Sequence, residues 1–193
     1  SQLDDAGLAF TVNPRLVQHA DALPSVPGQR VLVPLCGKTI DMAWLAERGL
    51  RVLGVELSPL AVEAFFHEQG RTPHVTQEGP FVRYAASGVE ILCGDVFALN
   101  ASVVGELHGV YDRAAMVALP PSMRSAYAQH VSRLLPSTAR GLLVSFDYDQ
   151  NEMQGPPFSV PEAQVRALWE PAFEVTRLAS HDILQDEPRM RER

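Results

Sequence analysis

The sequence predicts an α/β fold with a mostly parallel, doubly wound sheet that carries helices on both faces. Strand-like apolar runs alternate with helical segments along the chain, and this alternation favours parallel strands joined by helical crossovers. A second observation is the pair of segments at residues 31–38 (VLVPLCGK) and 52–56 (VLGVE). They indicate an apolar strand, a tight turn at Gly37 and, after a helix, a second strand that ends in an acid, an order typical of nucleotide-binding folds.

We expect six core strands and four helices in chain order. The strands are expected at residues 30–35, 51–56, 89–93, 109–112, 141–148 and 173–178. The helices are expected at residues 40–48, 59–69, 121–135 and 161–169. Three of these helices start at a proline, whose restricted φ and missing N–H suit a first helical turn, and Ser58 can cap the second helix. Gly49 and Gly70 follow two helices, at positions where glycine often ends a helix.

One segment interrupts the alternation of strands and helices. Residues 70–88 hold several glycines and prolines around the alternating run 81–84, which predicts a short hairpin inserted before the third core strand. Residues 149–161 predict a loop over the carboxyl ends of the strands. Because the chain has no internal repeat or linker, we expect one domain over residues 1–193, with an amino-terminal segment at 1–28 and a core at 29–193.

Composition limits the classes of function. The chain has 193 residues, of which 46% are hydrophobic, enough for one sizeable core. Its net charge of −7 disfavours a broad nucleic-acid footprint, which needs clustered Lys and Arg. No apolar run approaches the roughly 20 residues of a membrane helix, so we expect a soluble, cytoplasmic protein with neither a membrane nor a nucleic-acid partner. Cys36 and Cys93 are expected to be reduced and mostly buried, and no Cys/His cluster has metal-ligand spacing.

Glu56 is the strongest single candidate for a binding residue. At the end of the second strand it can accept hydrogen bonds from both ribose hydroxyls of an adenosine; the alternative is a solvated acid. The preceding turn has one glycine, Gly37, instead of G-x-G-x-x-G, so it lacks a cradle for a pyrophosphate. This combination favours S-adenosylmethionine over NAD as the ligand. An NAD(P)-dependent oxidoreductase is the alternative class.

Five motifs resemble the thiopurine S-methyltransferase family, in its bacterial branch. They are residues 31–42 (VLVPLCGKTIDM), 54–58 (GVELS), 111–115 (YDRAA), 147–150 (DYDQ) and 155–160 (GPPFSV), and the match runs from about Asn13 to Arg193. The resemblance implies a Rossmann-like, class I S-adenosylmethionine-dependent methyltransferase fold. It implies S-methylation of aromatic and heterocyclic thiols, with S-adenosylmethionine as cofactor and a small-molecule thiol as partner. Bacterial relatives are also linked to selenium and tellurium oxyanions, which adds an expected role in detoxification and tellurite resistance.

The resemblance also assigns residues to the cofactor. Leu35, in the turn after the first strand, takes the cofactor-contacting position. Asp95 and Val96 follow the third core strand, where an acid can accept from the adenine amine and an apolar residue can cover the ring. The alternative for Asp95 is a cap on the short turn at 96–99. The resemblance implies that residues 1–28 are a segment that caps the cofactor and that residues 29–193 are the catalytic core. Phe10 lies in this capping segment, which closes over the cofactor in the family; its alternative is simple packing.

Arg113 is the expected catalytic residue, because it follows the fourth strand beside the expected position of the sulfonium. A guanidinium stays protonated and cannot act as a base. It can attract an anionic thiolate or hold the carboxylate of the cofactor, and the resemblance gives it both a cofactor and a substrate contact. A structural pair with Asp112 or Asp95 is compatible with these roles.

The substrate side and the ends of the chain carry less information. Phe10, Tyr148 and Phe158 are expected at the substrate, because aromatic rings can stack on a flat heterocycle; polar residues at strand ends also serve as caps. The family has a tryptophan-containing amino-terminal lid and a final antiparallel strand beyond residues 173–178, and this sequence shows neither. We expect further residues at the lid and the tail. An inactive S-adenosylmethionine-binding module is the alternative if the chain is complete.

Overall fold

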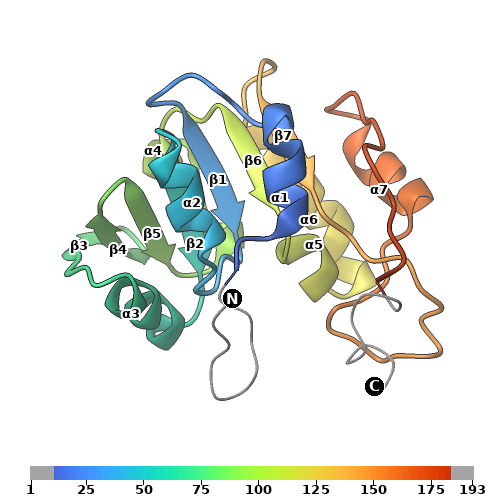
Figure 1. The fold of residues 1–193 in the computed structure, drawn as a ribbon, viewed down its shortest axis with the longest axis horizontal. Coiled ribbons are helices and arrows are strands. Elements are labelled where there is room, and N and C mark those ends of the chain that lie inside the picture. The colour runs from blue at the N-terminus through green and yellow to red at the C-terminus, as the bar shows by residue number, and fades with distance from the viewer. Residues whose placement is uncertain (1–10, 184–193) are drawn as a thin grey trace.

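The computed structural model describes residues 11–183, which form one seven-stranded sheet covered by helices (Figure 1). The strand order is β3-β4-β5-β2-β1-β6-β7. Neighbours from β5 to β7 run parallel, whereas β3 and β4 form an antiparallel hairpin that pairs with β5. The strands are β1 Arg30–Pro34, β2 Arg51–Glu56, β3 His74–Glu78, β4 Phe81–Ala86, β5 Val89–Cys93, β6 Gly109–Asp112 and β7 Arg140–Leu143. The predicted parallel sheet and the inserted hairpin are confirmed.

The described part of the chain contains seven α-helices and two short 3₁₀ turns. They are α1 Pro14–His19, α2 Asp41–Glu47, α3 Pro59–Glu68, α4 Ala101–Val104, α5 Ala115–Ala118, α6 Pro121–Leu134 and α7 Glu162–Trp169, with 3₁₀ turns η1 Ala20–Ala22 and η2 Val96–Ala98. None of these helices has the length and apolar content to cross a bilayer.

The sheet buries both of its faces, as a doubly wound fold requires. Alternate strand residues point to opposite faces, so two separate apolar clusters form. One cluster joins Val31 and Val52 to side chains of α1, α2 and α3, and the other joins Leu32 and Leu53 to side chains of α5, α6 and α7. Strands buried on both faces explain why their sequences read as continuous apolar runs.

Local sequence accounts for the way the helices nearest the site begin and pack. The Ser58 hydroxyl accepts from the Ala61 N–H at 3.3 Å and caps α3, which starts at Pro59 as predicted. Gly54 lies in β2 beneath α2. A Cβ at Gly54 would come within 2.8 Å of Cys36 Sγ and 2.9 Å of Met42 Sδ, so glycine allows the turn after β1 and α2 to pack closely on the sheet.

Both cysteines are free, and Cys36 is buried. Cys36 follows β1 and Cys93 ends β5, and β2 lies between these two strands in the sheet. The predicted absence of a disulfide between them follows from this spacing, because second-neighbour strands exceed the usual disulfide span.

The strand expected at residues 141–148 is shorter than predicted. β7 ends at Leu143. Val144 N–H still donates to Asp112 O at 2.9 Å, but the Phe146 carbonyl accepts from Val160 N–H at 2.7 Å. The chain therefore leaves the sheet after residue 144, because its next hydrogen bond goes to the returning loop.

The strand expected at residues 173–178 is absent, and that prediction was wrong. The Val175 carbonyl accepts from Arg166 Nη1 at 2.8 Å, Arg177 pairs with Glu162 at 3.2 Å, and the Phe173 ring packs edge-on against Trp169. Contacts with α7 thus hold this segment, and no described residue pairs with the free edge of β7.

Asp112, at the end of β6, is a buried carboxylate that ties the sheet to α5 and α6. Its Oδ1 accepts from the N–H groups of Ala115 and Met116 at 3.0 and 3.2 Å, and its Oδ2 accepts from the Tyr127 hydroxyl at 2.7 Å. Burial raises the pKa of Asp112 to about 6, and these hydrogen bonds lower it in part. A raised pKa means that the folded chain holds this proton more tightly than the unfolded chain does.

We therefore expect Asp112 to make the folded state less stable as pH rises from about 4 to about 6. Below that window the carboxyl is protonated in both states, and above it ionisation is harder in the folded state by up to about 3 kcal/mol. Asp112→Asn removes the titration. In urea unfolding at pH 4, 5, 6 and 7, the stability of the wild type relative to this variant should fall with pH across the window.

Tyr127→Phe is the matched control, because it removes the hydrogen bond that favours the ionised carboxylate. Without this hydrogen bond the pKa of Asp112 should rise further, so the stability of the folded state should keep falling to a higher pH. A difference between wild type and Asp112→Asn that stays constant from pH 4 to 7 would contradict the raised pKa.

Candidate active site

The carboxyl ends of β1, β2, β5 and β6 meet at one edge of the sheet, to which the arrowheads of β1 and β6 point in Figure 1. The register places Pro34 beside Val55 and Glu56 beside Cys93. Open parallel sheets bind ligands at this edge. Four segments predicted to contact the cofactor or substrate leave the sheet here: the turn after β1, the end of β2, and the loops after β5 and β6.

The turn after β1 has an uncommon backbone. Leu35 has φ 48° and Gly37 has φ 54°, both in the left-handed region that non-glycine residues seldom adopt. Cys36 N–H donates to Val55 O at 3.0 Å and ties the turn to β2. A left-handed leucine at a sheet edge is the kind of outlier that concentrates at binding sites.

Glu56 organises that turn. Its Oε1 accepts from Gly37 N–H at 3.0 Å, and its Oε2 accepts from Ser58 N–H at 2.8 Å. Two backbone donors thus orient the carboxylate across the gap between β1 and β2. Each carboxylate oxygen can accept more than one hydrogen bond, so both oxygens keep capacity for a ligand.

A backbone hydrogen bond holds the loop of Asp95 and Val96 beside Glu56, because Gly94 N–H donates to Glu56 O at 2.9 Å. Asp95 Oδ1 accepts from Phe97 N–H at 2.9 Å and caps η2, the structural role considered for it from the sequence. Val96 is buried in the core cluster. Its backbone carbonyl lies 2.9 Å from His130 Nε2.

Arg113 leaves the end of β6 and pairs with Asp41, with Nε 3.7 Å from Oδ2. The sequence had offered Asp112 or Asp95 as its partner, and this was wrong. The described residues show no ion pair between Arg113 and either of them. The carboxylates of Asp112 and Asp95 accept from backbone N–H groups of Ala115 and Phe97. The Arg113 side chain is 38% exposed, so it can still reach a ligand.

Asp41 is a site residue that the sequence analysis missed. It is 1% exposed, and its carboxylate accepts from Asn13 N–H at 2.9 Å and from the Tyr111 hydroxyl at 2.8 Å. Burial and then the Asp41 charge raise the pKa of Tyr111 far above its usual range, so the phenol remains a donor. No spacing signal links Asp41 to Arg113, since they lie 72 positions apart (113 minus 41) in the sequence.

On the predicted substrate side, the loop at residues 147–160 is held largely by its own groups. The Tyr148 hydroxyl donates to Pro157 O at 2.5 Å and accepts from Gln150 Nε2 at 3.2 Å. The Phe158 ring lies 5.9 Å from the guanidinium carbon of Arg124. The Tyr148 hydroxyl therefore supports the loop from within.

Arg124 is a second residue that sequence reasoning missed, because an arginine inside an amphipathic helix reads as a surface residue. It is 2% exposed. Its Nε donates to Leu119 O at 3.1 Å and its Nη1 to Gln164 Oε1 at 2.9 Å, whereas Nη2 is buried without a hydrogen-bond partner. Burial lowers the pKa of Arg124. An unsatisfied buried N–H group is costly unless a ligand or water completes it.

Three further expectations concern Phe10, the cysteines and metal ligands. Phe10 lies outside the described residues. Burial and then the nearby Glu56 charge raise the pKa of Cys36, which disfavours the thiolate that a nucleophile needs. No group of three metal-ligating side chains occurs within residues 11–183.

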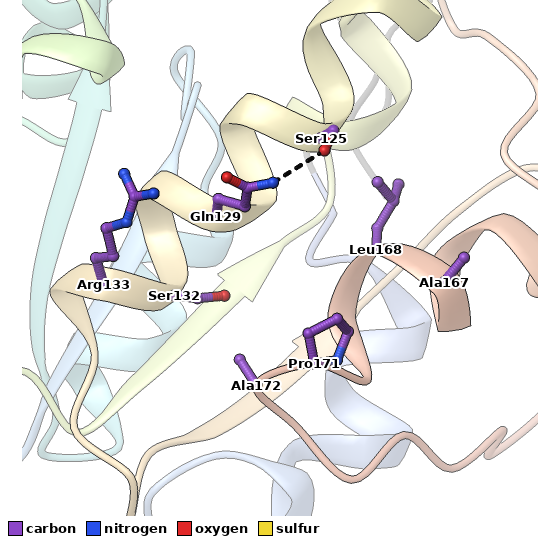
Figure 2. A pocket seen from close by; sticks show the side chains of 8 residues that line it. All are labelled: Ser125, Gln129, Ser132, Arg133, Ala167, Leu168, Pro171 and Ala172. Carbon is purple, nitrogen blue, oxygen red and sulfur yellow. Dashed lines mark hydrogen bonds between the residues drawn. The ribbon is translucent and has the colours of Figure 1, made fainter.

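A groove of about 330 Å³ lies elsewhere, between α6 and α7. Figure 2 shows its lining side chains, including Ser125, Gln129, Arg133 and Leu168. None of the predicted site residues lines it. It is therefore separate from the candidate active site.

Comparison with known proteins agrees with the fold and the motifs. Solved structures with similar folds include a magnesium protoporphyrin IX methyltransferase from Synechocystis with bound S-adenosylmethionine (20% identity, TM-score 0.59, 85% of this chain and 66% of that chain). A TehB-like S-adenosylmethionine-dependent methyltransferase from Corynebacterium glutamicum is also similar (16% identity, TM-score 0.56, 86% and 74%). At these identities the likeness shows the class I methyltransferase fold.

Sequence relatives are much closer. Thiopurine S-methyltransferase of Pseudomonas entomophila is 53% identical over 178 residues, which cover 92% of this chain and 82% of the relative. That of Bordetella petrii is 50% identical over 182 residues, with 94% and 83% covered. The family model for thiopurine S-methyltransferase matches residues 8–193. The chain therefore belongs to the thiopurine S-methyltransferase family of S-adenosylmethionine-dependent methyltransferases.

Proposed function

We propose that this protein transfers the methyl group of S-adenosylmethionine to the sulfur of small aromatic and heterocyclic thiols. The observation that supports it most is the Glu56 carboxylate, oriented by Gly37 and Ser58 at the sheet edge where Arg113 also emerges. An anionic acceptor for ribose and a cation for the sulfur nucleophile then stand at the ends of β2 and β6, the two strands that flank β1. The 50% level of identity with thiopurine S-methyltransferases supports the same substrate class.

The residues at the strand ends fit this cofactor. A Cβ built on Gly37 meets nothing within 4 Å, so the turn borders open space. Glu56 would accept from the ribose hydroxyls, the turn at Leu35 would lie against the methionine part, and Asp95 with Val96 would border the adenine. Phe10 is proposed to cover the cofactor and touch the substrate from the amino-terminal segment. When bound, S-adenosylmethionine supplies an electrophilic methyl group on a sulfonium.

The role proposed for Arg113 is to attract and orient an anionic thiolate and to contact the cofactor. A guanidinium acts as a cation and not as a base, so its contribution is electrostatic. The thiolate is the reactive form of a thiol, and aromatic thiols ionise readily. The site therefore needs alignment more than a strong base. Tyr148 and Phe158 are proposed to contact the ring of the substrate, and the unpartnered Nη2 of Arg124 is a further donor beside Phe158.

Two broader roles belong to the same proposal. Selenium and tellurium oxyanions are proposed as further detoxification targets by likeness to the bacterial family. The free thiols of Cys36 and Cys93 support a reducing, cytoplasmic setting. The NAD(P)-dependent oxidoreductase considered from the sequence is disfavoured by the single-glycine turn and by the family match.

Glu56→Ala should weaken binding of S-adenosylhomocysteine about 100-fold, because two charge-assisted hydrogen bonds to ribose are lost. Calorimetric titration of both proteins measures this change. Glu47→Ala, an exposed acid at the far end of α2, is the control and should bind like wild type. Wild-type protein that binds NADPH and no S-adenosylhomocysteine would overturn the proposed function, and cofactor binding without turnover on any thiol would identify an inactive module.

Arg113→Ala should lower kcat/KM more for thiols that are ionised at the assay pH than for thiols that remain neutral. The extra loss should be about tenfold, because the favourable charge interaction acts only on the anion. Steady-state rates with a series of arylthiols of graded pKa test it. Arg113→Lys keeps the charge and should recover much of the discrimination. An equal loss for both kinds of thiol would rule out electrostatic steering.

A further inference from the structure

A single buried carboxylate connects three segments that border the proposed cofactor site. Asp41 starts α2 directly after the turn that carries Leu35, accepts from the backbone of Asn13 ahead of α1, and accepts from Tyr111 in β6. It also lies 3.7 Å from Arg113 Nε. A buried carboxylate is tolerated when its partners compensate the loss of water. Here the compensation comes from two neutral donors and one cation, all from other segments.

Arg113 differs from the other two partners because it is only partly enclosed. Its Nε is buried and has no hydrogen-bond acceptor, and the ion-pair partner recorded for Arg113 within residues 11–183 is Asp41. Its side chain is 38% exposed, and no described residue accepts a hydrogen bond from its two terminal nitrogens. The inner edge of the guanidinium is thus attracted to a fixed charge while the outer edge keeps its donors for a ligand.

The geometry points to Asp41 as a positioning residue for Arg113 in methyl transfer. Tyr111 and Asn13 hold the Asp41 carboxylate in place, and that carboxylate sets where the Arg113 cation stands. Arg113 then presents Nη1 and Nη2 to the anionic sulfur. A long, flexible side chain held by an ion pair loses less rotamer freedom when the substrate binds. This inference rests on the proposed function, since it concerns the same site.

A double-mutant cycle tests the inference. Asp41→Asn keeps the shape and an acceptor oxygen but removes the charge that faces Arg113. We expect it to lower kcat/KM for an anionic arylthiol about tenfold in the wild-type background, and less than about twofold in the Arg113→Ala background. A residue with a purely structural role would lower kcat/KM by the same factor in both backgrounds, so this result would overturn the inference.

Glu90→Gln is the matched control for a carboxylate-to-amide change. Glu90 pairs with Arg51 and Arg83, and it lies near the opposite end of the sheet, since Arg51 starts β2. Its effect on kcat/KM should be the same with and without Arg113. If Asp41→Asn does not fold, Tyr111→Phe takes its place, because it loosens Asp41 without removing its charge. A threefold loss of kcat/KM in Tyr111→Phe that disappears in the Arg113→Ala background supports the inference. A loss of kcat/KM that persists in that background overturns it.

Titration of wild type with S-adenosylhomocysteine separates the two claims. Wild-type binding and turnover together with an additive cycle would overturn the role of Asp41 and leave the proposed function standing. A wild-type protein that does not bind S-adenosylhomocysteine would overturn both claims.

Discussion

The candidate site forms because β2, β1 and β6 pair in parallel and in register. Arg30 to Pro34 align with Arg51 to Val55, and Val31 aligns with Gly109. Parallel strands in register end at the same edge, so the turn after β1, the acid that ends β2 and the cation after β6 emerge together. Helical crossovers bury both faces of the sheet. The polar groups that follow the strands are thereby concentrated at its edge.

Two adjacent residues anchor the end of β6 to opposite faces of the sheet. Tyr111 reaches the carboxylate of Asp41 in α2, and the carboxylate of Asp112 reaches Tyr127 in α6. The alternation of side chains along a strand produces this arrangement, because neighbours must point to opposite faces. Arg113 follows directly, so the backbone from which it extends is held from both layers. Two buried Asp–Tyr hydrogen bonds thus fix the backbone from which the partly exposed Arg113 side chain extends. A buried polar group that loses its partner destabilises the fold.

Glu56 has both a structural and a proposed functional role. Its oxygens accept from two backbone N–H groups and still have lone pairs for ligand hydroxyls. The sequence pattern of a strand-end acid after a one-glycine turn was sufficient to predict its position. The same pattern reasoning was wrong for residues 173–178. An apolar segment forms a strand only where a neighbour supplies the ladder, and contacts with Arg166 and Trp169 hold this segment at α7 instead.

The amino-acid sequence alone was enough to predict the α/β class, the inserted hairpin and the start of helix α3 at Pro59 after Ser58. It was also enough to predict the positions of Leu35, Glu56 and Arg113 at strand ends. These features depend on local periodicity and turn chemistry, which a single segment carries. The pairing of Asp41 with Arg113, and the burial of Arg124 with one unpartnered nitrogen, became visible only in the folded chain. Such pairings depend on which segments the sheet and helices bring together. The paired residues lie far apart along the chain, so no sequence spacing predicts their contact.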